Sequence, residues 1–258
     1  MHAEFGLSLG TLYAFLLVLV RVSGVVVLVP LPGFGSGPGM ARIVFALSLT
    51  LCLFPAWPPL AIRTPPPLGV LAGWAVAETA FGMLIGLAVA FLAEGFQLAA
   101  QFINLQAGYS YASAVDPNSQ ADSTVLQLFT QLTSSLLFFS LGLDRQVIRI
   151  FAASFEWFPV GSFPLTIQSA DGVVRLGAGM FLTGFKLAMP VIALLLLIDI
   201  ALSLFGRMQA QIQLLTLAFP IKMLTALAIL PVLAAVMPAV LERAAGQTFT
   251  SLLHILRP

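Results

Sequence analysis

Long runs of apolar residues alternate with short polar connectors along this 258-residue chain. Each run approaches or exceeds the about 20 residues that a helix needs to cross a bilayer. The pattern therefore predicts an all-α membrane protein with about six hydrophobic helical segments, at about 9–30, 43–60, 70–93, 124–143, 176–204 and 214–240. Glycine and proline fill the first connector, 31–42, which should form an irregular turn.

Three parts of this pattern depart from simple spans. The third segment should continue as helix to about Asn104. Residues 144–158 place four apolar side chains at helical spacing, which predicts a short amphipathic helix lying at an interface. The last two segments contain interior prolines that should kink them: Pro190, Pro220, Pro231 and Pro238. No linker or charge block divides the chain, so we expect a single membrane domain over 1–258.

Composition supports this class. Hydrophobic residues make up 60% of the chain and charged residues 8%, against about 25% charged residues in soluble domains. The net charge of +1 gives no electrostatic reason to expect nucleic acid as a partner. The single cysteine, Cys52, excludes an intrachain disulfide framework. Since His2–Ser8 lacks the basic n-region of a signal peptide and the first apolar run is too long for a cleaved signal, we expect this run to be retained as a span.

Five ionisable residues lie inside the apolar runs: Arg21, Glu78, Lys186, Asp199 and Lys222. Such a group is costly at membrane depth unless it is paired or faces water. The set therefore predicts a helical bundle with a polar interior or an aqueous path. Asp199 and Lys222 lie at similar distances from the connector 205–213, so they are a candidate buried ion pair. The alternative is that each side chain snorkels to a nearby interface.

The third segment carries two patterned faces. Residues at steps of four should let another helix approach closely, and Glu78 among them should have a charged or polar partner. This helix-packing set is Glu78, Gly82, Gly86 and Ala90. A polar stripe follows, which lines an aqueous passage, docks on a polar partner, or marks a helix end emerging into water. The stripe is Glu94, Gln97, Gln101 and Asn104.

Catalytic signatures are missing from the sequence. The two histidines, His2 and His254, lie near the two termini, and neither an HExxH nor a GxSxG pattern occurs. Asp116 and Asp122 could bind Mg²⁺, but beside Pro117 they are more typical of a turn with a helix cap. We therefore expect no enzyme, no cofactor and no metal site.

The run Gln106–Ser119 (QAGYSYASAVDPNS), followed by Val125, Leu126 and Phe129, resembles the FliR family of flagellar export-gate membrane proteins. Further matching positions are spread over nearly the whole chain: Pro32, Phe34, Gly35, Pro38, Arg42, Glu78, Gly82, Gly86, Ser154, Phe155, Pro159, Gly161, Pro190, Arg207, Phe219 and Pro220. Two features depart from the family pattern. Residues 210–213 read AQIQ where the family has Pro-Gln-x-Asn, and Ala218 replaces a glycine.

The resemblance implies a multi-pass protein of the bacterial inner membrane, within the flagellar basal body and next to its rod. It implies kinked hairpins that join FliP-like and FliQ-like subunits in a helical gate of the type III export system, through which unfolded flagellar proteins pass. Membrane lipid and the exported proteins are further expected contacts. The resemblance assigns a pore plug to about 107–122, with Gly108, Tyr109, Ser110, Tyr111, Val115, Asp116, Pro117 and Asn118 as its candidate residues.

The same resemblance places 205–213 on the cytoplasmic side, against an FlhB-like switch protein, with Arg207, Gln209, Gln211 and Gln213 as contacts. The distribution of arginines over the connectors predicts the opposite orientation, with both termini in the cytoplasm. We follow the resemblance, because that rule is weak for a protein held mainly by other subunits. Two alternatives stay open: an SctT-like export-gate subunit of an injectisome, and a secondary transporter. A transporter should show an internal repeat, and we find none.

Overall fold

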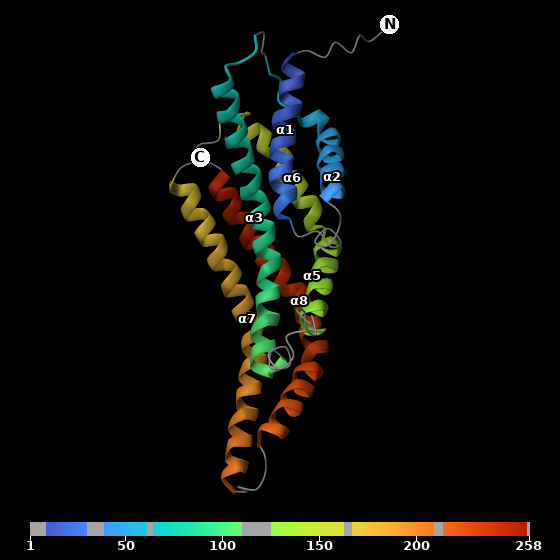
Figure 1. Cartoon of the computed structure of the whole chain (residues 1–258), viewed down its shortest axis with the longest axis vertical. Coiled ribbons are helices and arrows are strands. Elements are labelled where there is room, and N and C mark those ends of the chain that lie inside the picture. Colours follow the sequence, from blue (N-terminus) through green and yellow to red (C-terminus); the bar gives the residue numbers. More distant parts are fainter. Residues whose placement is uncertain are drawn as a thin grey trace. The chain divides into compact units, whose positions relative to one another are not determined.

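The computed structural model describes residues 9–29, 39–60, 64–109, 125–162, 167–208 and 214–256. Within these residues the chain is helical (Figure 1). The elements are α1 (Leu9–Leu28), α2 (Gly39–Cys52), the 3-10 turn η1 (Phe54–Ala56), α3 (Leu68–Ala107), α5 (Val125–Ser140), α6 (Leu143–Trp157), α7 (Ile167–Met208) and α8 (Leu214–Leu256).

Among the described residues, four helical stretches are long and apolar enough to cross a membrane: Leu9–Leu28, Leu68–Ala107, Ala170–Met208 and Leu217–Ile255. A bent pair, Leu126–Ser140 with Leu143–Trp157, would add a fifth span if it counts as one. Gly142 separates the two members of this pair with φ of 67°, a backbone conformation that glycine adopts without strain. The prediction of an all-α membrane protein is confirmed.

The second apolar segment is the clearest correction. The sequence predicts a span over about 43–60, but α2 ends at Cys52 after 14 residues, short of the length of a spanning helix. Pro55 lies in η1, and Trp57 then adopts an extended backbone. The indole Nε1 of Trp57 donates a hydrogen bond of 3.0 Å to the carbonyl of Thr50, so the chain folds back on the end of α2.

The other helices agree with the predicted segments or are longer than predicted. The third segment continues without a break through the polar stripe, as α3 to Ala107. The amphipathic pattern forms α6, whose buried residues include Phe151, Ser154 and Phe155. Helices α7 and α8 are longer than predicted, with 42 and 43 residues, and both continue through their interior prolines.

The Cα trace forms two compact units. Unit 1 comprises Met1–Ala90, Gly142–Leu176 and Thr248–Pro258, and unit 2 comprises Phe91–Leu141 and Gly177–Gln247. Helices α3, α7 and α8 each contribute residues to both units. The single membrane domain over 1–258 stays a prediction.

In unit 1, α1 packs against both α2 and the first half of α3. The fully buried side chains there include Leu17, Phe81 and Ile85. In unit 2, the second half of α3 lies against α7, where a Cβ on Gly184 would stand 2.8 Å from the carbonyl oxygen of Gly95. Glycine at this crossing lets the two backbones touch.

Candidate functional site

Helices α1 and α3 make backbone contact in unit 1. A Cβ on Gly82 would lie 2.1 Å from the carbonyl oxygen of Arg21, and one on Gly86 would lie 2.8 Å from that of Val25. Gly24 is the matching small residue on α1, where a Cβ would lie 2.8 Å from the carbonyl oxygen of Thr79. Real Cβ atoms do not approach so closely, so the contact requires glycine. The glycines of the predicted packing face thus point at α1, while Ala90 is half-buried.

This close approach encloses an ion pair between α1 and α3. The Arg21 guanidinium donates through Nε to Glu78 Oε2 and through Nη2 to Glu78 Oε1, the latter at 3.0 Å. Both side chains are completely buried. Two parallel hydrogen bonds of this kind fix the geometry as well as the charge balance. Glu78 therefore has the partner that its position at membrane depth requires.

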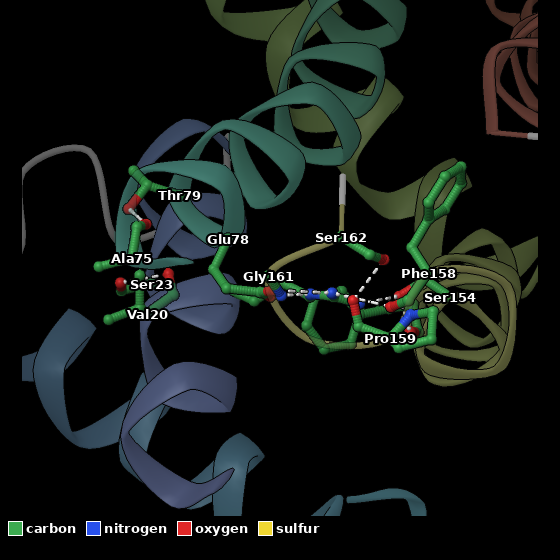
Figure 2. Close-up of polar contacts among 12 residues, drawn as sticks. Val20, Ser23, Ala75, Glu78, Thr79, Ser154, Phe158, Pro159, Gly161 and Ser162 are labelled. Atoms are coloured by element: carbon green, nitrogen blue, oxygen red, sulfur yellow. Dashed lines mark hydrogen bonds and ion pairs between the residues drawn. The ribbon is translucent and has the colours of Figure 1, made fainter. Parts of the chain in front are cut away.

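The loop after α6 closes the other side of the pair. Arg21 Nη1 donates 3.1 Å to Ser154 Oγ, and Nη2 donates 3.2 Å to the carbonyl of Phe158. The backbone N–H of Gly161 donates 2.8 Å to Glu78 Oε1. Figure 2 shows Glu78 pointing from α3 toward Gly161, with Ser154 and Phe158 on the far side of the loop. The contacts tie α1, α3, α6 and this loop together, and we call them the Arg21–Glu78 node.

Aromatic rings shield the node. The guanidinium carbon of Arg21 lies 4.5 Å from the ring centroids of both Phe81 and Phe155, a distance suited to cation–π attraction. Gly161 has φ of 80°, and a Cβ there would lie 2.2 Å from Cδ1 of Trp74. Only glycine fits this position on both counts. The node is a buried, charge-balanced structural contact between helices, and it exposes no acid or base to a substrate.

A second ion pair lies in unit 2. Lys222 Nζ on α8 lies 3.0 Å from Asp199 Oδ1 on α7, and Gln106 Nε2 donates 3.1 Å to Asp199 Oδ2. The side chains are 38% exposed for Asp199 and 13% for Lys222, so the pair is only partly withdrawn from solvent. The structure thus brings together the two residues that the sequence pairs, and it adds Gln106. Their contribution to assembly stays a prediction.

The predicted plug begins at a fixed point in unit 2. Gly108 ends α3 with φ of 88°, and a Cβ there would lie 2.5 Å from the ring of Phe219. Tyr109 donates its hydroxyl to the carbonyl of Met223 at 2.9 Å, and burial raises the pKa of this phenol above its usual range. Tyr109 therefore remains a protonated donor. The other plug candidates lie outside the described residues: Ser110, Tyr111, Val115, Asp116, Pro117 and Asn118.

The remaining candidates have mixed environments. In the polar stripe, Glu94 and Gln101 are exposed, Asn104 is buried and Gln97 is half-buried. The Oε1 atom of Gln97 is buried, and no described residue gives it a hydrogen bond. Arg207 is exposed at the end of α7. The other three predicted contacts of the switch protein lie outside the described residues: Gln209, Gln211 and Gln213. No group of three potential metal ligands occurs among the residues that the structure describes.

Sequence reasoning identified Arg21 and Glu78 separately but did not pair them. The available signal was charge: Arg21 and Glu78 are the two charged residues within the first three apolar segments. Gly24, opposite Gly82 in the structure, was a second signal. Ser154 and Gly161 stand 133 and 83 residues away from their partners, and no local pattern links residues so distant.

Comparison with known proteins identifies the family. The sequence profile described as "Bacterial export proteins, family 1" matches residues 12–248. The chain is similar to the flagellar biosynthetic protein FliR of Escherichia coli, with 27% identity over 92% of this chain and 90% of that protein. It is also similar to the proteins of the same name from Bacillus subtilis, with 28% identity over 94% of both chains, and Caulobacter vibrioides, with 28% identity over 84% and 87%. The chain belongs to the bacterial export proteins, family 1.

Proposed function

We propose that this chain is a FliR-type membrane subunit of the flagellar protein export apparatus. The observation that carries the proposal is the family match over residues 12–248. It is supported by similarity to proteins named FliR over nearly the whole length of those proteins. The chain is a multi-pass membrane protein, and it is an export component and not an enzyme. Its bacterial location is the inner membrane, within the flagellar basal body.

The chain works together with other export components, and FliP-like and FliQ-like subunits are the partners that we propose. Support comes from the low burial of α7 and α8 by the rest of this chain. In an 18-residue apolar segment of α7 and one of α8, 22% and 17% of the residues are buried, against 56% in the corresponding segment of α3. Apolar helices left bare by their own chain are covered by lipid or by other helices. An FlhB-like protein at 205–213 completes the proposed set.

We further propose that about 107–122 closes the gate. The support is the anchoring of its first residues: Gly108 lies against Phe219, and Tyr109 bonds to α8. A closing segment needs such a fixed base, because a loop with two free ends would not return to one position. The polar residues of the stripe precede it on α3 and lead toward it.

The experiment is deletion of the gene in its native bacterium, followed by complementation. We expect loss of swimming and of exported flagellar proteins in the medium, both restored by the wild-type gene. Unchanged flagellar export with loss of a different secretion activity would instead favour the injectisome alternative. Unchanged export of every kind would reject the function.

A complementing gene that lacks 109–115 tests the closure. We expect the complex with FliP-like and FliQ-like subunits to assemble, but the membrane to leak small ions and growth to slow. The matched control replaces 109–115 with seven Gly and Ser residues, which keeps the chain length and removes the bulk. Wild-type conductance in the deletion variant, with normal assembly, would show that this segment is not the gate.

A further inference from the structure

A groove between α7 and α8 in unit 2 has two chemically different ends. Its volume is about 660 Å³. One end is aliphatic and is lined by Pro190 and Val191 of α7 and by Ile229 and Val232 of α8. The other end is lined by Thr183 and Lys186 of α7 and by Arg243 and Gln247 of α8, with Leu182 and Val240 beside them. The groove therefore joins an apolar trough to a pair of cations.

The order of residues explains this division. Helices α7 and α8 run in opposite directions from the short connector at 209–213. Lys186 and Arg243 are both farther from that connector than Val191 and Val232 are, so both cations lie beyond the aliphatic end, with Arg243 seven residues farther from the connector than Lys186. An amphiphile with one anionic head and one aliphatic tail matches this arrangement.

The two cations lack partners within the described part of the chain. No ion pair or hydrogen bond joins Lys186 or Arg243 to a described residue, although both lie within the apolar stretches Ala170–Met208 and Leu217–Ile255. Glu242 precedes Arg243 but does not line the groove. Ionisable residues in such stretches are expensive unless an opposite charge or water meets them. Both side chains are exposed on this chain, so the groove is open to an anion at this point.

We propose that this groove binds an anionic phospholipid, whose phosphate contacts Lys186 and Arg243 while one acyl chain lies along the valine wall. Basic pockets between membrane helices are known to hold anionic head groups. The volume falls within the about 300–1,000 Å³ of small-molecule sites. The inference goes beyond the export function and does not depend on it.

The test measures lipid binding to the full-length purified chain. Phosphatidylglycerol and phosphatidylcholine with identical acyl chains are titrated separately, and bound lipid is counted by native mass spectrometry. We expect phosphatidylglycerol to bind more tightly than phosphatidylcholine. In the double variant Lys186→Gln/Arg243→Gln, we expect phosphatidylglycerol to bind about 30-fold more weakly, since each cation near an anionic head group contributes roughly a factor of five.

A matched control removes two positive charges elsewhere. Arg145→Gln/Arg149→Gln changes exposed cations on α6 and should leave phosphatidylglycerol binding unchanged. If the Gln variant fails to fold, the charge-preserving exchange Lys186→Arg/Arg243→Lys is measured in its place and should retain phosphatidylglycerol binding. Val232→Trp should fill the apolar end of the groove and weaken phosphatidylglycerol binding as well.

Several outcomes would overturn the proposal. One is equal binding of the two lipids to the wild-type chain. Another is unchanged phosphatidylglycerol binding in a folded Lys186→Gln/Arg243→Gln variant, or equal loss in the α6 control. A third is a wild-type chain that binds neither lipid, together with a Lys186→Glu/Arg243→Glu variant that no longer assembles with its partner subunits. That result would mean that a carboxylate on another protein meets these cations.

Discussion

Removing one member of the buried Arg21–Glu78 pair should destabilise this protein far more than removing both. In Arg21→Met, the Glu78 carboxylate keeps a hydrogen bond from Gly161 and loses every charged partner. In Glu78→Met, the guanidinium keeps Ser154 and the Phe158 carbonyl as acceptors but has no negative charge nearby. Both side chains are fully enclosed, so water cannot replace the missing partner.

The expected magnitudes follow from that enclosure. Breaking a buried pair by removing one partner costs about 3–5 kcal/mol, a factor of roughly 10² to 10³ or more in the folding equilibrium. In Arg21→Met/Glu78→Met no charge is buried. The remaining penalty is the loss of two partly buried hydrogen bonds, those made by the N–H of Gly161 and by the carbonyl of Phe158, about 1–3 kcal/mol together. Methionine between Phe81 and Phe155 keeps favourable sulfur–aromatic contacts, which limits the packing loss.

The assay is a denaturant titration of the full-length chain in mild detergent, with helicity as the signal. Independent effects would give the double variant a loss of about 6–10 kcal/mol, the sum of the two single changes. We expect a loss of about 1–3 kcal/mol, and thus a coupling of at least about 3 kcal/mol. Arg149→Met, which removes an exposed cation on α6, is the control and should change stability little. An additive double variant, or single variants that lose less than about 1 kcal/mol, would refute the reasoning.

Two further changes test the other contacts. Gly82→Ala should destabilise by about 1–3 kcal/mol, because its Cβ meets the α1 backbone, whereas Gly73→Ala on the same helix meets nothing within 4 Å and should be neutral or stabilising; equal thermal shifts would contradict this. Asp199→Asn and Lys222→Met should each lower the yield of the assembled complex, and the double variant should recover part of it, with a coupling of about 1 kcal/mol. Additive losses of yield would remove the pairing idea.

The sequence predicted helices well wherever an apolar run was also free of clustered prolines. Hydropathy treats 43–60 as one run because prolines do not interrupt it. Pro55, Pro58 and Pro59 nevertheless withhold backbone N–H groups and fix φ, so helix α2 stops at Cys52. In α7 and α8 the interior prolines are isolated, and both helices continue past them. Spacing between prolines, and not their number, separates the two outcomes.

Site prediction succeeded where the partners belong to one helix or one hairpin. The glycine spacing that places Gly82 and Gly86 on one face is a property of α3 alone. Asp199 and Lys222 meet because a short connector sets their depth. The Arg21–Glu78 node depends instead on how α1, α3 and the loop after α6 pack. That information is not contained in the periodicity of any single segment.

Whether each of the five membrane-depth charges is paired depends on how much of its helix is buried by the rest of the chain. In an 18-residue apolar segment of α1 and one of α3, 44% and 56% of the residues are buried, and Arg21 and Glu78 neutralise each other within these helices. In α7 and α8 the shares fall to 22% and 17%. Asp199 and Lys222 still find each other in that region, but Lys186 meets no described acid. A lone cation on a bare helix costs the least when the surroundings supply its anion, so Lys186 is the position at which this chain depends most on what lies around it.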